Sequence, residues 1–361
     1  MKFEKYIFKL KPCERMARMV RPGLTSIQIQ EIRDWVKDKG LPSYRADQII
    51  KWVYGNAETF DDMTNIPKAI RDSLEADFML REVTTDRVLL SDDGTKKFVF
   101  TVSGGEKVEG VLMKYKYGST VCISTQAGCR MGCKFCASPP AGYCRSLTAG
   151  EMLGQVTEAG KECGGRVDNV VLMGIGEPLD NFENVVTFLQ NLSAPDGYQM
   201  SLRHVSLSTC GLADKIRELA EYKFGLTLSV SLHAPNDELR GKIMPINKKY
   251  GIVQLLSAVE YYTQMTGRRV VFEYALIRGV NDSVENAREL AVLLRKKLCH
   301  INLIACNPVK GTGFFPPPAQ AVQNFYKTLE QSGASVTIRR TMGADLDASC
   351  GQLRRNGQRE S

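Results

Sequence analysis

The sequence contains no long apolar run. Its first twenty residues, MKFEKYIFKLKPCERMARMV, lack the continuous apolar stretch that a signal peptide needs. No later segment approaches the roughly 18 apolar residues of a membrane-spanning helix. These absences argue against a secreted or membrane protein, and we expect a cytoplasmic protein with no membrane partner.

Cysteine, in contrast, is plentiful. The chain has 11 cysteines, and four of them fall within the stretch CISTQAGCRMGCKFC at positions 122–136. An odd number of cysteines in a reducing compartment is a poor basis for a disulfide framework. The cluster therefore predicts metal ligands or reactive thiols.

The length and the net charge of the chain limit its domain organisation and the kind of partner that it binds. With 361 residues, 43% of them hydrophobic, the chain can form one large domain and a smaller one. The formal net charge of +8 suits an anionic partner. Basic residues gather at both ends, in a predicted extension over residues 1–23 and at Arg354, Arg355 and Arg359. A solvated terminus explains residues 1–23 equally well.

Residues 24–85 predict a small helical module. In the first helix, which Thr25 or Ser26 would cap and Gly40 would end, the apolar face is formed by Ile29, Ile32 and Val36. A second helix would end before Gly55, and NIPKAIRDSLEADF predicts a third with Pro67 near its first turn. Residues 86–114 then alternate in the β manner between the turn signals DDGT and GGE, which predicts a β-meander.

From residue 115 to 345 the sequence alternates between apolar β-rich runs and helix-length segments. The runs are VCIST, NVVLMG, HVSLST, LTLSVSL, VVFEYALI and INLIAC, with SVTIRR trailing. Because no single Gly-rich dinucleotide-binding loop is present, this pattern fits a barrel better than a doubly wound sheet. The predicted fold class is α/β, a partial parallel (β/α)6 barrel preceded by the helical module and the meander. Its chemistry is expected at the C-terminal ends of the strands.

The cysteine stretch follows the first of these strands. Cys129, Cys133 and Cys136 have the spacing C-x3-C-x2-C, whereas a structural zinc site would need a fourth ligand at matching spacing. A 4Fe-4S cluster held by three thiolates would leave one iron free to bind a small molecule. Zinc and a plain electron-transfer cluster are the alternatives.

The C-x3-C-x2-C loop, with Phe135 before its last cysteine, resembles the signature of the radical S-adenosylmethionine (SAM) superfamily. The resemblance implies that the free iron chelates SAM and that an electron from the cluster breaks the sulfonium bond. Residues at the strand ends would bind SAM, although each alone is also typical of a helix cap or a satisfied polar group. These residues are Gly176, Glu177, Ser208, Ser231, Leu232, His233 and Asn307.

Longer segments carry a narrower resemblance. They are VLMKYKYGSTVCISTQAGCRMGCKFCA, LTAGEMLGQV, GEPLDN, SLHAPNDELR, MPINKKY, FEYALIRGVND, INLI and GADLDASCGQL. From about residue 105 to 355 the chain thus closely resembles the RlmN/Cfr family of radical SAM 23S rRNA adenine methyltransferases. The helical module resembles theirs too, which implies that residues 24–85 contact RNA, although a packing appendage is the alternative. Only the first twenty-odd residues lie outside the resemblance.

The resemblance implies roles for two further cysteines and a glutamate. Cys350, in the tail over residues 346–361, would be methylated by one SAM. A radical from a second SAM would activate that methyl group, so that it adds to the adenine. Glu109 would remove the proton from the ring carbon, and Cys122 would form a transient disulfide with Cys350 to release the product.

The implied substrates are an adenosine of 23S rRNA near the peptidyl-transferase centre and an adenosine of the tRNA anticodon loop. GEPL, with Pro178, and the run from SLHAPNDELR to MPINKKY resemble the carbon-2 enzymes of the family more than the carbon-8 enzymes, which implies methylation at carbon 2. A radical SAM paralogue with another RNA or a peptide as substrate is the alternative, as is an RNA-binding protein with a vestigial cluster. The resemblance also implies an electron donor such as a flavodoxin or ferredoxin, and a monomer.

One segment departs from the family pattern. After Cys136 the chain reads ASPPAGYCRSLTAGE, with Pro139, Pro140 and Cys144 in place of a small Thr/Gly-rich loop. Two prolines remove two backbone donors beside the cluster. We expect Cys144 to be a packing residue.

Overall fold

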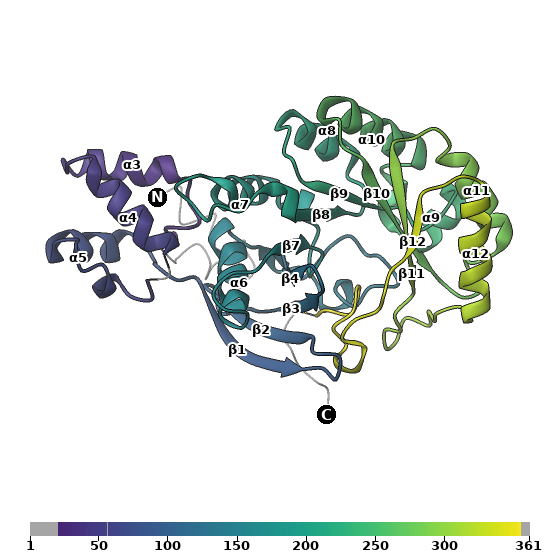
Figure 1. Ribbon diagram of the computed structural model, residues 1–361, viewed down its shortest axis with the longest axis horizontal. Coiled ribbons are helices and arrows are strands. Elements are labelled where there is room, and N and C mark those ends of the chain that lie inside the picture. Colours follow the sequence, from purple (N-terminus) through teal and green to yellow (C-terminus); the bar gives the residue numbers. More distant parts are fainter. Residues whose placement is uncertain (1–20, 56, 355–361) are drawn as a thin grey trace, which may run out of the picture.

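The computed structural model describes residues 21–55 and 57–354 (Figure 1). The predicted basic extension lies almost wholly outside this range, as do Arg355 and Arg359. No helix within the range is both long and apolar enough to cross a membrane.

The predicted helical module forms one end of the molecule (Figure 1). Its helices are α3 (Ile29–Asp38), α4 (Tyr44–Tyr54) and α5 (Lys68–Asp77), with the 3-10 turn η1 (Phe60–Asp62) between the last two. The predicted faces are buried, with Ile32 and Val36 of α3 packing in one apolar cluster with Ile49 and Ile50 of α4. These apolar side chains form a core of their own, separate from the main one.

The predicted cap of the first helix is wrong. Gln28 is the N-cap residue of α3, and its backbone N–H donates to the Glu31 carboxylate at 2.8 Å. Thr25 and Ser26 lie farther upstream, where their hydroxyl groups donate instead to the buried carboxylate of Glu82. A cap is a local signal, and here a long-range acceptor competes for the same hydroxyl groups.

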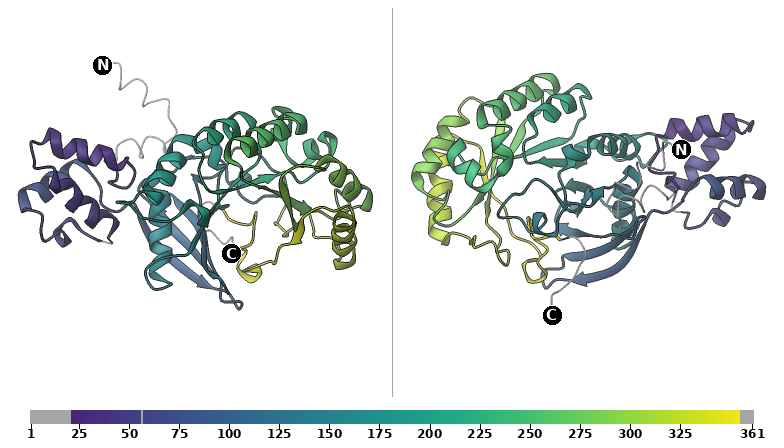
Figure 2. Two further views of the ribbon diagram at one scale, coloured as in Figure 1. Left: turned by 45° about the horizontal axis from the view of Figure 1, so that its top comes forward. Right: turned by 180° about the vertical axis from the view of Figure 1, so that it is seen from behind.

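A single curved sheet of ten strands forms the rest of the scaffold (Figure 2). The meander strands are β1 (Val83–Leu90), β2 (Lys96–Val102) and β3 (Lys107–Tyr115). They continue antiparallel into β4, so the meander extends the barrel sheet itself. The parallel strands are β4 (Gly118–Cys122), β7 (Asn169–Leu172), β8 (Val205–Thr209), β9 (Thr227–Ser231), β10 (Val270–Leu276), β11 (Cys299–Ala305) and β12 (Val336–Ile338).

Helices connect the parallel strands in the predicted alternation. They are α6 (Ala149–Lys161), α7 (Phe182–Ser193), α8 (Ala213–Glu221), α9 (Asp237–Ile243), α10 (Ile252–Thr266), α11 (Val284–Leu293) and α12 (Ala319–Gln331). The parallel strands neighbour one another in chain order, with β1 and β12 as the two edges of the sheet. The α/β fold with an open, partial parallel barrel is therefore confirmed.

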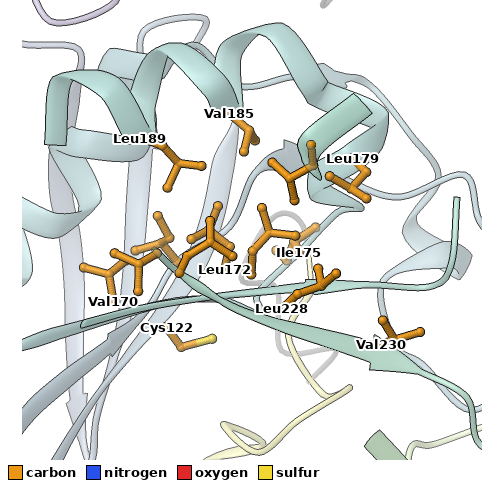
Figure 3. Close-up of a cluster of buried hydrophobic side chains, with 14 of the residues drawn as sticks. Cys122, Val170, Leu172, Ile175, Leu179, Val185, Leu189, Leu228 and Val230 are labelled. Carbon is orange, nitrogen blue, oxygen red and sulfur yellow. The ribbon is translucent and has the colours of Figure 1, made fainter. Parts of the chain in front are cut away.

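The main core lies between this sheet and its helices. Figure 3 shows Val170 and Leu172 of β7 beneath Val185 and Leu189 of α7, all of them buried. Such alternating burial follows from a helix covering one face of each strand. Cys122 lies on the other side of these strands, away from the α7 side chains, as Figure 3 also shows.

A buried carboxylate joins the helical module to the core. Glu82 accepts hydrogen bonds from Ser26 Oγ at 2.7 Å and from Thr148 Oγ1 at 3.0 Å. Its burial, with a smaller contribution from the nearby Glu151 carboxylate, raises the pKa of Glu82 to about 7. Gly150 lies against it, and a Cβ there would lie 1.7 Å from Glu82 Oε2, so a larger residue would force this carboxylate to shift.

This raised pKa predicts a pH-dependent stability. Since the folded state holds the Glu82 proton more tightly than the unfolded chain, stability is lost as pH rises from about 4.5 to about 7. The full loss corresponds to about 3 kcal/mol. We expect the melting temperature of the Glu82→Gln variant to fall less than that of wild type between pH 5 and pH 8. Parallel melting curves for the two proteins would contradict this expectation.

Candidate active site

The three clustered cysteines lie on a loop closed at its base by a small two-stranded sheet. Strands β5 (Gln126–Ala127) and β6 (Arg145–Ser146) pair antiparallel on either side of residues 128–144. Gly128 has a φ of 89°, and a Cβ there would lie 1.7 Å from the Gly142 carbonyl oxygen. This close approach requires glycine and folds the loop back on itself.

Cys129, Cys133 and Cys136 line one cavity at the C-terminal ends of the parallel strands, which we call the first cavity. Among the described residues, no three His, Cys, Asp or Glu side chains converge on one metal-sized point. A 4Fe-4S cluster binds each thiolate through a different iron, so it needs three thiols around a shared cavity rather than a common point. The arrangement of these cysteines fits such a cluster.

Burial sets the chemistry of these thiols. It raises the pKa of Cys129 to about 12 and raises the pKa of Cys133 further. Apolar side chains surround them, since Cys133 and Phe135 pack with Ile243 and Met244. Thiolates in such surroundings need bound cations, which iron would supply.

The other side of the first cavity holds Gly176 and Glu177. Gly176 has a φ of 107°, and a Cβ there would lie 2.7 Å from the side chain of Gln126. The Glu177 carboxylate is buried and accepts hydrogen bonds from the backbone N–H groups of Leu179 at 3.1 Å and Cys210 at 2.7 Å. Burial raises the pKa of Glu177, with these bonds opposing the shift. The carboxylate is thus fixed in place beside the cysteines.

His233 is held as a neutral ring. Its Nδ1 accepts the backbone N–H of Ala275 at 2.9 Å, which places the ring proton on Nε2, and burial lowers the pKa of His233 to about 3. The ring meets Phe135 edge to face, with centroids 4.9 Å apart. A φ of 56° at His233 is maintained by its carbonyl accepting from Asn281 at 2.7 Å.

The remaining predicted SAM-binding residues divide into two groups. Ser208, Ser231 and Asn307 line the first cavity. Leu232 does not line it; its side chain is fully buried in the main core. The structure therefore brings together every predicted SAM-binding side chain except that of Leu232.

Arg240 fixes the strand ends around this cavity. Its guanidinium is fully buried and donates to the carbonyl groups of Cys210 at 2.7 Å and Ser231 at 3.2 Å. Burial lowers the pKa of Arg240. A buried cation bound to carbonyl groups on two strand ends fixes both ends relative to each other.

Cys350 lies at the junction of two cavities. It lines the first cavity and also a second cavity, which Cys122 lines. Asn307 Nδ2 donates to the Cys350 carbonyl at 3.0 Å, and the backbone N–H of Ala137 donates to the Gly351 carbonyl at 2.7 Å. The cysteine loop and the tail are thus held side by side.

Cys122 is the last residue of β4 and is buried at the wall of the second cavity. Both Cys122 and Cys350 are free thiols. Burial, and to a lesser extent the neighbouring Cys350, raises the pKa of Cys122 to about 12. The two cysteines that the sequence set apart therefore meet at one cavity.

Glu109, unlike the two cysteines, does not lie at the wall of a cavity. Its carboxylate is buried on β3, but Glu109 lines neither the first nor the second cavity. Lys97 Nζ lies 3.0 Å from its Oε1, and the backbone N–H of Arg354 donates to its Oε2 at 2.9 Å. The carboxylate is thus engaged by the tail beyond Cys350.

Sequence reasoning missed two charged residues of this site. Glu273 lines the first cavity, and its buried Oε2 has no hydrogen-bond partner among the described residues. Such an orphaned oxygen fits a cavity built for a polar ligand. Arg339 lines both cavities beside Cys350. The signal was available, because Glu273 interrupts an apolar strand and a buried charge there needs a function or a partner.

The departing segment after Cys136 forms part of the wall of the first cavity. Pro139 begins a short 3-10 turn, η2 (Pro139–Ala141), and lines the first cavity. Cys144 is buried in the main core, with its Sγ 3.6 Å from Glu106 Oε1.

Comparison with known proteins places this site in a family. A family model described as the radical SAM superfamily matches residues 123–291, and one described as the ribosomal RNA large subunit methyltransferase N-terminal domain matches residues 23–80. A probable dual-specificity RNA methyltransferase RlmN from Desulforamulus reducens is 50% identical over 92% of this chain and 96% of its own length. The chain belongs to the RlmN family. A protein of the same description from Clostridium novyi is 47% identical over 92% of this chain and 98% of its own length.

A solved structure agrees with this membership. A radical SAM methyltransferase from Sphaerobacter thermophilus is 42% identical to this RlmN-family chain, with a TM-score of 0.88 over 92% of this chain and 99% of that one. The predicted family and the predicted enzyme class, a radical SAM methyltransferase, are confirmed. A 4Fe-4S cluster and SAM are its cofactors, as predicted.

Proposed function

We propose that this protein methylates carbon 2 of an adenosine in 23S rRNA near the peptidyl-transferase centre and of an adenosine in the tRNA anticodon loop. Its relatives from Desulforamulus reducens and Clostridium novyi, both described as probable dual-specificity RNA methyltransferases, support an RNA substrate. The formal net charge of +8 supports it too. A single-stranded loop can present an unstacked base to a deep pocket.

The position of Cys350 carries the proposal. Its side chain is exposed and belongs to the walls of both cavities, one holding the three clustered cysteines and the other holding Cys122. A residue at this junction can receive a group on one side and deliver it on the other. Neither SAM cleavage nor RNA binding alone needs such a residue.

Each protein residue then has a defined task. When bound, the cluster and SAM supply the methyl group that Cys350 accepts and the radical that activates it. Cys350 delivers this carbon to the adenine and is left joined to the base through it. Glu109 accepts the proton lost from the ring carbon. The unpaired electron left on the adduct would pass back to the cluster, so that a closed-shell thioether joins Cys350 to the base. The Cys122 thiolate attacks the Cys350 sulfur, so that an S–S bond forms as the bond between that sulfur and the delivered carbon breaks. A proton then completes the new methyl group.

The electronics of carbon 2 explain why the methyl group needs a covalent carrier. This carbon lies between two ring nitrogens and is electron-poor, so it does not attack the methyl group of SAM as a nucleophile. A covalent carrier such as Cys350 avoids that difficulty. A flavodoxin or ferredoxin would supply the electron, and we expect the protein to act as a monomer.

Mass spectrometry of RNA tests the proposal. A host lacking its own enzyme would be complemented with wild type or with Cys350→Ala, and its digested 23S rRNA and tRNA analysed. We expect 2-methyladenosine in both RNAs with wild type and in neither with the variant. Methylation at carbon 8 would contradict the site of modification, and the absence of any methylated adenine would favour another substrate.

A further inference from the structure

We propose that Lys97 is a positioning residue for this reaction. Together with Glu109 it forms a buried clamp on the Cys350 segment, which we define as residues 343–354. The clamp holds Cys350 at the junction of the two cavities and keeps Glu109 outside them until the segment moves. The inference rests on the proposed function for the role of Glu109, whereas the clamp itself is a property of the structure.

Lys97 uses all of its hydrogen-bonding capacity on this clamp. Its Nζ lies 3.0 Å from Glu109 Oε1 and 3.2 Å from each of the carbonyl oxygens of Leu346 and Asp347. An ammonium group has three N–H donors, and these three acceptors match them. The Lys97 side chain is only 8% exposed, so it depends on these partners instead of on water.

Glu109 holds the other end of the segment. Its Oε1 faces Lys97, and its Oε2 accepts the backbone N–H of Arg354. The two charged groups thus contact the chain on both sides of Cys350, four residues after it at Arg354 and three and four residues before it at Asp347 and Leu346. Moving Cys350 far from its place requires breaking at least one of these contacts.

The sheet explains why the clamp is rigid on one side only. Lys97 lies opposite Val111 and Glu109 lies opposite Val99 on the antiparallel strands β2 and β3, so the two charges are diagonal neighbours on one face. Their backbones are fixed in the sheet. The Cys350 segment, in contrast, is a run of turns with the short 3-10 turn η6 (Ala344–Leu346).

This difference in rigidity determines which contacts change when the Cys350 segment moves. Glu109 can exchange the Arg354 N–H for another partner when the segment moves, while Lys97 stays beside it on the neighbouring strand. A carboxylate released in this way keeps its contact with Lys97. Opening of the Cys350 segment and availability of Glu109 as a base are therefore one event.

A matched control lies next to Lys97 in the sequence. Lys96 is on the same strand, but its Nζ forms an ion pair with Glu162 at 2.6 Å on the protein surface. Lys96→Met and Lys97→Met make the same chemical change on opposite faces of β2. Lys97→Arg keeps the charge, and the double variant Lys97→Met/Glu109→Gln leaves no unpaired buried charge.

Hydrogen–deuterium exchange of the holoenzyme is the primary test, with peptides covering residues 343–354 as the probe. In Lys97→Met we expect exchange there to be about tenfold faster than in Lys96→Met, because the contacts that close the segment are lost. Lys97→Arg should restore most of the protection. If Lys97→Met does not fold, the double variant carries the same expectation. Equal exchange in the tested variant and Lys96→Met would overturn the clamp.

A second readout tests the positioning role. We expect Lys97→Met to form several times more 5′-deoxyadenosine per methylated adenosine than wild type, since SAM cleavage continues while Cys350 and Glu109 are misplaced. An unchanged ratio would contradict that role. Failure of the proposed function is distinguishable, because wild type would then methylate no adenosine while the exchange difference between Lys97→Met and Lys96→Met persisted.

Discussion

Cys133→Ala is expected to abolish binding of the iron–sulfur cluster and, with it, all cleavage of SAM. Cys133 lies between the other two ligands in the sequence and is buried among apolar side chains. Without it, two thiols remain for a cluster that already has one iron without a protein ligand. Iron content and the visible absorption of anaerobically purified protein would measure the loss. Formation of 5′-deoxyadenosine should fall by at least about 10³-fold.

Cys163→Ala is the matched control for this prediction. The Cys163 thiol lies beyond the C-terminal end of α6 and donates to the carbonyl of Arg166 at 3.3 Å, outside both cavities. We expect normal iron content and normal SAM cleavage from it. A full cluster in Cys133→Ala would show that the ligand assignment is wrong.

Cys122→Ala is expected to trap a covalent adduct between the protein and its RNA substrate. In the proposed sequence of events Cys122 acts only in the release step, so Cys350 is methylated, activated and joined to the base without it. Release then lacks its attacking thiol. Denaturing gel electrophoresis with labelled RNA would show a slowly migrating band, and free methylated RNA should fall by at least about 10³-fold.

Cys122→Ala/Cys350→Ala provides the control for the adduct. Without Cys350 no sulfur is available to carry the carbon, so the band should vanish. A persistent band would place the attachment at another residue. Efficient release of methylated RNA by Cys122→Ala alone would exclude Cys122 as the resolving thiol.

The sequence predicted the fold well where local and long-range preferences agree. The β-rich runs from NVVLMG to INLIAC became parallel strands because each carries a helix over one face, and periodicity reports that burial. The first parallel strand, β4, ends at Cys122, so the predicted run VCIST overlaps it by two residues. Burial of Ile32 and Ile49 in the module followed from the same rule. The cap of α3 could not be predicted, because Ser26 donates to Glu82, which is 56 residues away in the chain.

In the candidate site, too, features set by local sequence could be predicted and features set by long-range contacts could not. The spacing of Cys129, Cys133 and Cys136 predicts a shared ligand site, and the structure places their side chains around one cavity. The contact of Glu109 with Lys97 and Arg354 depends on strand register and on where the tail folds, 245 residues later in the chain. No local pattern contains that information.

The most direct test of the account follows one methyl group. Enzyme would be purified with an isotopically labelled methyl group on Cys350, as shown by mass spectrometry of the peptide that contains it, and then given RNA, a reductant and unlabelled SAM for a single turnover. If Cys350 is the methyl carrier, the methylated adenosine formed in this first turnover contains the labelled carbon and the Cys350 peptide loses it. Unlabelled product, with the label still on Cys350, would mean that the methyl group reaches the base by another route.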